Sequence, residues 1–143
     1  MDKFVNILKL SVGTETVEGL QAWQRTKRAQ APDGLPRHVT RMFPKRVDEI
    51  INGGSIYWVI KGVILCRQKI VRLDEVFGQD GIRRCAIVSE PELIRVAATI
   101  KLPFQGWRYL TAQDAPIDLN GSRAEEEALP AGLNAALAEI GVL

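Results

Sequence analysis

The sequence predicts an α+β fold with a small mixed or antiparallel sheet and three to four helices. Two observations support this class. Short runs of β-branched and aromatic residues alternate with turn residues in the middle of the chain, and apolar stripes at helical spacing lie near both ends. With 143 residues, 46% of them hydrophobic, the chain can bury a core without disulfides or metals. We therefore expect residues 1–143 to form one domain.

The first third of the chain is predicted to form a strand, a helix, an extended piece and a second helix. Residues 4–10 alternate loosely, as strand residues do. Thr14 has an N-cap side chain before a narrow apolar stripe that includes Trp23, and the turn residues 32–34 end that helix. After an extended piece at 38–42, a second helix is expected from Pro44 to Asn52, because proline suits the first helical turn and two glycines follow.

The clearest strand signal lies at residues 55–61 and 63–71, which are rich in β-branched and aromatic residues and are separated by Gly62. A hairpin and a single kinked strand both fit this pattern. Further strands are expected at 83–89, after a turn, and at 93–100.

The last part of the chain is predicted to be irregular and then helical. Residues 103–121 contain prolines and glycines together with three aromatic residues, which is typical of a loop that packs over a core. A capping box at 122–125 and an apolar stripe formed by Leu133, Leu137 and Ile140 predict the final helices.

Several kinds of chemistry are disfavoured by what the chain contains. His38 is its one histidine, and Cys66 and Cys85 are far apart in sequence, so a zinc site would have to rely on carboxylates. No phosphate-binding loop, dinucleotide glycine fingerprint or esterase-type nucleophile motif occurs. We therefore expect no metal and no cofactor, and we lean against an enzyme without deciding the question.

The chain is expected to be cytoplasmic and to have no membrane partner. No apolar run reaches the roughly 18 residues that span a bilayer, and the first residues lack the layout of a secretory signal. The two cysteines are interpreted as reduced, buried thiols.

The net charge of +2 hides a strong asymmetry along the chain. Residues 25–72 contain eleven Lys and Arg against three acids, a local charge of +8, whereas residues 111–143 contain one Arg against six acids, a local charge of −5. A basic face attracts anions. The acidic segment could equally fold back over the basic one, and the sequence does not decide between these arrangements.

The candidate phosphate-binding residues are concentrated in a basic segment at 37–46, and its members are Arg37, His38, Arg41, Lys45 and Arg46. If 38–42 is extended, Arg37 and Arg41 share one face, which suits phosphate or carboxylate recognition. Lys45 and Arg46 would occupy a helical first turn, where the helix dipole disfavours cations unless an anion binds. Alternatively, the two acids that follow them, Asp48 and Glu49, pair with these cations on a solvated face.

Aromatic residues near this segment are candidates for stacking on a base. Tyr57 and Trp58 alternate across their strand, so one is expected to face the core and the other to be available. Trp107, next to Arg108, could clamp a planar ligand or pack as a lid over the core. Arg83 and Arg84 could extend the basic surface or merely protect a strand edge.

Three stretches closely resemble a bacterial family catalogued only as a domain of unknown function. They read RHVTRMFPKRVDEIINGGSIYWVIKGVILCRQKI (37–70), GIRRCAIVSEPEL and PFQGWRYL. The resemblance covers most of the chain and implies family membership without an activity.

The layout also resembles the PUA-like superfamily of small β-barrels, which includes ASCH and EVE domains and many binders of RNA or modified bases. The similar features are a short helix ending in glycine (44–54), two strands, further strands and an aromatic loop. ASCH domains typically carry a Gly-Lys-Lys-Thr-like run after that helix, where this chain has Gly53-Gly54-Ser55-Ile56-Tyr57. The resemblance therefore implies a barrel-like sheet and no ASCH-type hydrolysis.

The leading hypothesis is a module that binds nucleic acid (RNA or DNA) or a nucleotide, with the basic segment on phosphates and Trp58 or Trp107 on a base. One alternative is a small-molecule enzyme with a pocket under the Trp107 loop and with His38 or an acid as general base. Another is an interaction subunit that docks through the C-terminal apolar stripe. The oligomeric state is left open.

Overall fold

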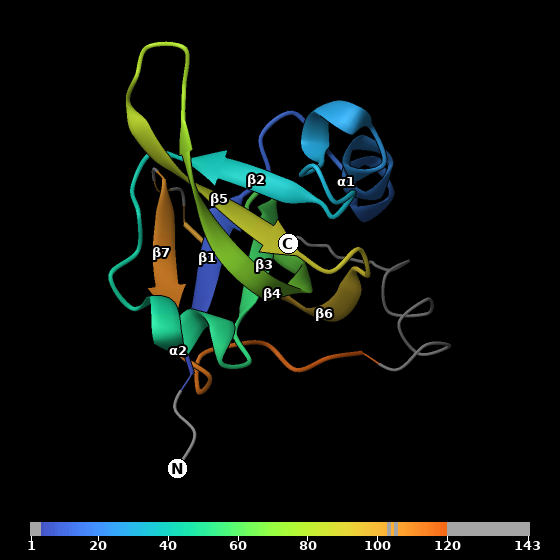
Figure 1. The fold of residues 1–143 in the computed structure, drawn as a ribbon. Coiled ribbons are helices and arrows are strands. Elements are labelled where there is room, and N and C mark those ends of the chain that lie inside the picture. The colour runs from blue at the N-terminus through green and yellow to red at the C-terminus, as the bar shows by residue number, and fades with distance from the viewer. Residues whose placement is uncertain (1–3, 103, 105, 120–143) are drawn as a thin grey trace.

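The computed structural model describes residues 4–102, 104 and 106–119. Figure 1 shows a strongly twisted sheet with two short α-helices at different sides of it. In chain order the elements are β1 (Asn6–Leu10), α1 (Val17–Gln24), the 3₁₀ turn η1 (Lys27–Ala29), β2 (Arg37–Thr40), α2 (Val47–Ile51), β3 (Ser55–Ile60), β4 (Val63–Phe77), β5 (Arg83–Ser89), β6 (Ile94–Ile100) and β7 (Trp107–Leu110).

Within the described residues, seven strands form one mixed sheet. The strand order is β2-β5-β4-β3-β1-β7, and β6 pairs with β4 beside this path. β1 and β3 are parallel, and the other pairs are antiparallel. The α+β class and the mixed sheet are thus confirmed, but the sheet is open, with β2 and β7 at the ends of the path.

β4 is long, and its two halves pair with different strands of the sheet. Its first half pairs with β3 and β6, and its second half pairs with β5. The register shifts between Ile64 and Cys66 and between Ile70 and Arg72. Such irregularities bend a strand and increase its twist. The β4–β5 hairpin consequently projects well beyond the rest of the sheet (Figure 1).

The two ends of the open sheet are linked by the segment 41–46, which follows β2. The indole Nε1 of Trp107 donates to the backbone oxygen of Met42 over 3.0 Å. The hydroxyl of Tyr109 accepts from the backbone N–H groups of Lys45 and Arg46 at 3.1 and 3.2 Å. Aromatic side chains of β7 therefore hold the segment that leaves β2, in place of strand-to-strand hydrogen bonds.

Both faces of β3 are covered, which explains why all six of its residues are buried. The inner face, defined as the face of Ile7, Ile56 and Trp58, packs against α1 through Val17 and Leu20. The opposite face carries a second cluster around Tyr57 and Val96, whose other buried members are Leu8, Val59, Ile64 and Leu110. A strand covered on both sides reads as a continuous apolar run, as this one does.

The hairpin interpretation of residues 55–71 is confirmed, and the single kinked strand is wrong. Lys61 and Gly62 both have positive φ values, of 52° and 80°, as two-residue hairpin turns of type I′ require. The second strand is longer than predicted, because β4 continues to Phe77, and the turn at 78–81 follows directly. The predicted strands 4–10, 83–89 and 93–100 correspond to β1, β5 and β6, with small differences at their ends.

The prediction that residues 103–121 are irregular is wrong for β7. Its four residues pair with β1 as an edge strand, and only one of them is fully buried. A strand this short has too few residues for its alternation to stand out in the sequence.

The described residues contain two α-helices and one 3₁₀ turn, so the expected three to four helices are not confirmed. The first helix has Thr16 as its N-cap, with its hydroxyl accepting from Gly19 at 2.9 Å, and ends at Gln24 before η1. α2 begins at Val47, so Lys45 and Arg46 precede its first turn. Arg46 is the N-cap residue of this five-residue helix and so remains at the positive end of its dipole. The expected helices after residue 121 lie outside the described residues.

Candidate functional site

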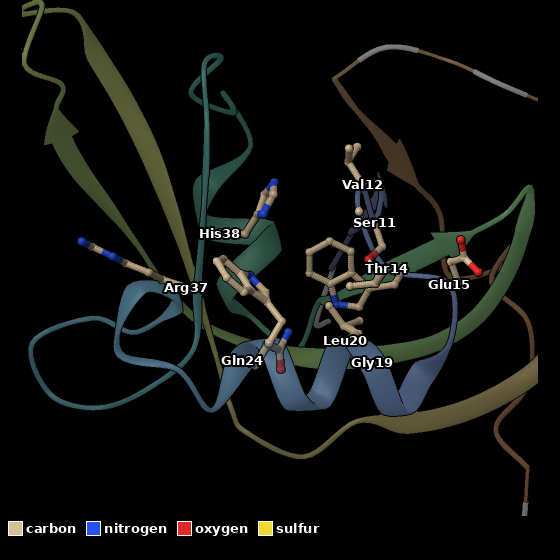
Figure 2. Close-up of a pocket in the computed structure, with 12 residues that line it drawn as sticks. Ser11, Val12, Thr14, Glu15, Gly19, Leu20, Gln24, Arg37 and His38 are labelled. Atoms are coloured by element: carbon tan, nitrogen blue, oxygen red, sulfur yellow. Dashed lines mark hydrogen bonds between the residues drawn. The ribbon is translucent and has the colours of Figure 1, made fainter.

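A cavity of about 480 Å³ lies between the loop after β1, one face of α1 and the strands β2 and β3. Figure 2 shows its labelled residues around the space above α1. Its volume falls within the usual range of small-molecule sites, about 300–1,000 Å³. The lining residues are Ser11, Val12, Gly13, Thr14, Glu15, Gly19, Leu20, Trp23, Gln24, Arg37, His38 and Trp58.

A buried hydrogen-bond network supports two of the lining residues, Gln24 and Trp58. The amides of Gln24 and Gln68 bond reciprocally, at 2.8 and 2.7 Å. The Gln68 Oε1 also accepts from the Trp58 indole N–H at 2.9 Å, and its Nε2 donates to the Glu90 backbone oxygen at 3.0 Å. Because Gln68 is fully buried, these bonds fix the orientation of the indole and of the Gln24 amide.

His38 extends from β2 toward the cavity, whereas Arg37 projects to the other side of that strand (Figure 2). The imidazole makes an edge-to-face contact with Trp58, with ring centroids 5.3 Å apart and planes at 86°. Burial, assisted by the positive charge of Lys9, lowers the pKa of His38 from 6.5 to about 4. The ring is therefore neutral at neutral pH, and it makes no hydrogen bond to another described residue.

The loop between β1 and α1 supplies small polar groups to the cavity. The hydroxyls of Ser11 and Thr14 are hydrogen-bonded to each other. Glu15, the one acid among the described residues of the lining, forms an exposed ion pair with Lys61 at 3.3 Å. The walls thus combine two indoles, one imidazole, one amide and two hydroxyls, a set that suits a flat ligand with polar edges.

The basic segment 37–46 is divided by the structure. Arg46 makes a two-point ion pair with Glu49, at 3.1 and 2.6 Å, and lies 5.1 Å from the ring centre of Tyr109. The interpretation in which an acid of α2 neutralises this arginine is thus confirmed. Arg37, Arg41 and Lys45 form no ion pair with any described residue. Because β2 ends at Thr40, strand alternation does not place Arg41 on the same face as Arg37.

The other predicted arginines do not line the cavity. On the β4–β5 hairpin, Arg83 pairs with Glu75 and stacks on Phe43 at 4.4 Å, and Arg84 pairs with Asp80 at 3.0 and 2.9 Å. Arg108 lies 5.7 Å from the ring centre of Phe104. Neighbouring carboxylates thus compensate the hairpin arginines, so the hairpin has little net positive charge with which to attract an anionic ligand.

Among the aromatic candidates, the cavity includes Trp58 alone. The expectation that one of Tyr57 and Trp58 is available at the surface is wrong, since they are only 6% and 3% exposed. Trp58 nevertheless borders the cavity from within, and Tyr57 lines a second cleft on the opposite face. Trp107 packs against Tyr109 with ring centroids 4.9 Å apart and does not line the cavity.

Two residues that line the cavity, Trp23 and Gln24, are not evident from the sequence pattern, and neither is the position of Lys9, which does not line it. Trp23 belongs to the apolar stripe of the first helix, yet it is 46% exposed at the cavity. Gln24 faces inward because its side-chain amide is hydrogen-bonded to that of Gln68, which is 44 residues away in the sequence. Lys9 carries no motif, but a lysine two residues after Ile7 in an alternating strand occupies a core-facing position, and that is a detectable signal.

The cysteine thiols and the possible metal ligands of the described residues do not form a second reactive site. Burial raises the pKa of the Cys66 thiol to about 12 and that of Cys85 to about 11. Within residues 4–119, excluding 103 and 105, no three His, Cys, Asp or Glu side chains gather as a metal site would require. No helix of this part is long and apolar enough to cross a membrane.

The similarity of the chain to a known protein family extends over almost its full length. A family model with the description "Protein of unknown function (DUF1489)" matches residues 7–143. No curated protein and no solved structure matches the chain.

Proposed function

The chain belongs to the DUF1489 family, and we propose that its cavity binds the base of a nucleotide or of single-stranded nucleic acid. The observation that carries this proposal is the composition of the cavity walls. Trp23, which is 46% exposed, offers aromatic surface, Trp58 forms part of the buried wall behind it, and the hydroxyls of Ser11 and Thr14 offer donors and acceptors. Bases stack on aromatic side chains and are distinguished by hydrogen bonds to their edges.

The placement of cations around β2 supports a path for the phosphates outside the cavity. Arg37 precedes His38 in β2, an edge strand of the sheet, and Arg41 directly follows the end of this strand. The Arg37 side chain projects away from the cavity, so it suits a phosphate outside the base pocket (Figure 2). Neither arginine is engaged by a carboxylate of the described residues. We propose that the phosphates follow β2 while one base enters beside Trp23. The order of elements expected from the sequence resembles that of PUA-like domains, many of which bind RNA or modified bases, although the sheet is open here and not barrel-like.

Binding of labelled single-stranded RNA and DNA, measured by fluorescence anisotropy, tests the proposal. We expect affinity to fall strongly between roughly 50 and 200 mM salt, because phosphate contacts release counterions. Trp23→Leu should weaken binding by roughly tenfold, since stacking contributes about 1–3 kcal/mol per base. Trp23 is a suitable site because its partial exposure makes unfolding of the variant less of a concern.

Phe77→Leu is the matched control, because Phe77 is a 63% exposed aromatic residue at the end of β4 that does not line the cavity. This variant should bind as the wild type does. The proposal fails if neither RNA nor DNA binds at low salt, or if Trp23→Leu and Phe77→Leu bind equally well.

A further inference from the structure

The second cleft, on the face of the sheet opposite the cavity, is lined by polar side chains from three neighbouring strands. Its volume is about 370 Å³, within the range of small-molecule sites, about 300–1,000 Å³. β1, β3 and β4 lie next to one another (Figure 1), and they contribute Asn6, Ser55, Tyr57 and Arg67 to the lining. Tyr57 and Arg67 are in register across β3 and β4, so they project from the same face. These side chains therefore belong to one site, separate from the cavity beside β2.

An ion pair between Arg67 and Asp118 forms one wall of the cleft. The Arg67 guanidinium donates to the two Asp118 oxygens at 2.8 and 2.7 Å and to the Ser55 hydroxyl at 2.9 Å. Backbone hydrogen bonds to β6 hold the residues on either side of Asp118, at 2.8 and 2.9 Å. Arg67 also holds the pKa of Asp118 below its usual range, so this carboxylate stays charged. The wall is thus fixed in position, and its two charges compensate each other.

Two deeply buried side chains of the cleft have polar groups to which no described residue bonds. The side-chain oxygen of Asn6 accepts from the Ser55 backbone N–H at 2.9 Å, which fixes the orientation of the amide. Neither the amide –NH₂ of Asn6 nor the hydroxyl of Tyr57 forms a hydrogen bond with another described residue. Asn6 and Tyr57 are only 2% and 6% exposed, and burial raises the pKa of Tyr57, so its hydroxyl stays protonated. Because buried polar groups are nearly always hydrogen-bonded, these two groups indicate where a ligand would bind.

The polar groups of the cleft favour a neutral ligand with an oxygen acceptor. The Asn6 –NH₂ and the Tyr57 hydroxyl can both donate, and a carbonyl oxygen accepts two hydrogen bonds. A ligand carboxylate would instead add a second negative charge beside Asp118, whose arginine is already engaged. Phe4, which is 40% exposed, and Pro116 add apolar surface to the lining, which suits a ring.

We propose that this cleft binds a small neutral amide that carries a ring, either a carboxamide or a lactam. The carbonyl oxygen of the ligand accepts from the Asn6 –NH₂ and the Tyr57 hydroxyl. The amide N–H donates to an oxygen of Asp118, because a carboxylate oxygen can accept more than the one hydrogen bond that Arg67 gives it. This site is independent of the base-binding cavity and does not rest on the proposed function.

Titration of the whole ¹⁵N-labelled chain, followed by two-dimensional ¹H–¹⁵N NMR, tests the site. Nicotinamide, nicotinate and 3-methylpyridine share one ring and differ in a single group, and 2-pyridone adds a cyclic amide. We expect nicotinamide or 2-pyridone to shift the Ser55 backbone signal and the Asn6 side-chain signals. Nicotinamide should bind roughly fivefold or more tightly than nicotinate and 3-methylpyridine.

Tyr57→Phe should weaken binding of the amides by about two- to tenfold, as expected for the loss of one neutral hydrogen bond. The variant should fold, because the hydroxyl that it removes has no partner among the described residues. Tyr109→Phe is the matched control: Tyr109 is the other tyrosine of the chain, and it does not line the cleft. This control should bind the amides as the wild type does.

Asp118→Asn tests why the ligand is neutral. Removal of this negative charge leaves Arg67 uncompensated by its partner, so nicotinate should bind more tightly than it does to the wild type. Unchanged nicotinate binding in this variant would show that Asp118 does not exclude anions.

Three other results would overturn the site. They are no binding of either amide, equal binding of nicotinamide and nicotinate by the wild type, and amide binding that is unaffected by Tyr57→Phe. Amide-induced shifts centred on the Trp23 indole signal would place the amides in the cavity instead and would also contradict the site. Base binding is judged separately, by the comparison of Trp23→Leu with Phe77→Leu.

Discussion

The β4–β5 hairpin and the cavity beside β2 both carry cations, but they differ in how these are compensated. On the hairpin, Arg72, Arg83 and Arg84 each pair with at least one carboxylate within a few ångströms. By contrast, Arg37, which lines the cavity, and Lys9 and Arg41, which do not, have no such partner among the described residues. Local density of Lys and Arg in the sequence is therefore a poor guide to a binding surface. The unpaired cations, and not the total charge, indicate where an anion can bind.

The two regions also differ in how their polar contacts are exposed. The hairpin ion pairs lie in water, where such pairs contribute little to stability. The cavity is supported by a largely buried network centred on Gln68, in which each bond replaces one that water would have made in the unfolded chain. The buried contacts should therefore contribute more to the free energy of unfolding than the exposed ion pairs do.

Breaking the buried network should have the largest effect. Gln68→Leu would leave the Gln24 amide and the Trp58 indole N–H without partners in the core. Unsatisfied buried groups cost about 1–3 kcal/mol each, so we expect the free energy of unfolding to fall by about 3–4 kcal/mol. Urea denaturation followed by circular dichroism measures this change.

Arg84→Ala is the control on the hairpin, because it breaks the two-point pair with Asp80 in an exposed position. Its unfolding midpoint should stay close to that of the wild type. A loss of stability in Arg84→Ala as large as that in Gln68→Leu would show that burial does not decide what these contacts are worth.

A decrease in pH should reduce the stability contributed by the cavity region, through His38, and leave that of the β4–β5 hairpin unchanged. The folded state holds the pKa of His38 at about 4, while the unfolded chain binds this proton with a pKa near 6.5. The unfolded state therefore binds more protons between these values, and stability should fall as pH decreases from about 6.5 to about 4. The gap corresponds to a loss of roughly 3 kcal/mol in the free energy of unfolding.

His38→Phe, which keeps an aromatic ring beside Trp58, should lose that much less over the same pH range. Arg84 and a backbone N–H hold the pKa of Asp80 well below its usual range, so the hairpin pair should stay charged throughout. If wild type and His38→Phe lose stability in parallel, His38 is not kept neutral by its surroundings.

Much of the sheet can be predicted from the sequence because its strands are locally marked. The hairpin at Lys61-Gly62 is indicated by β-rich runs around a glycine, and the turn before β5 by its glycines. β7 escapes prediction because its four residues gain order only by pairing with β1, which is about a hundred positions earlier. The predicted start of α2 is too early because Pro44 does not begin the helix, and Tyr109 holds the 41–46 segment instead.

The cavity is harder to predict than the fold, because its parts come from distant places in the chain. His38 and Trp58 stand out for their chemistry, but their contact depends on how β2 and β3 are placed. Gln24 and Gln68 are ordinary surface residue types whose burial follows only from their pairing. The pairing of Arg46 with Glu49 is foreseeable, since the two lie three residues apart. Lys9 is recognisable in principle as a charge at a core-facing position.

The most direct test of the central claim compares two double variants in the same nucleic-acid binding assay. Arg37→Ala with Arg41→Ala removes two unpaired cations beside the cavity, and Arg83→Ala with Arg84→Ala removes two paired cations on the hairpin. Single-stranded RNA and DNA are titrated at several salt concentrations, so that affinity and salt dependence are both obtained. Net charge changes equally in the two variants.

We predict that the cavity variant binds more weakly and that the slope of log affinity against log salt becomes shallower by about 1.4, or roughly 0.7 for each phosphate that the variant no longer neutralises. The hairpin variant should keep both the affinity and the slope of the wild type. Equal weakening of binding in the two variants would show that only net charge matters, and would contradict a phosphate path along β2.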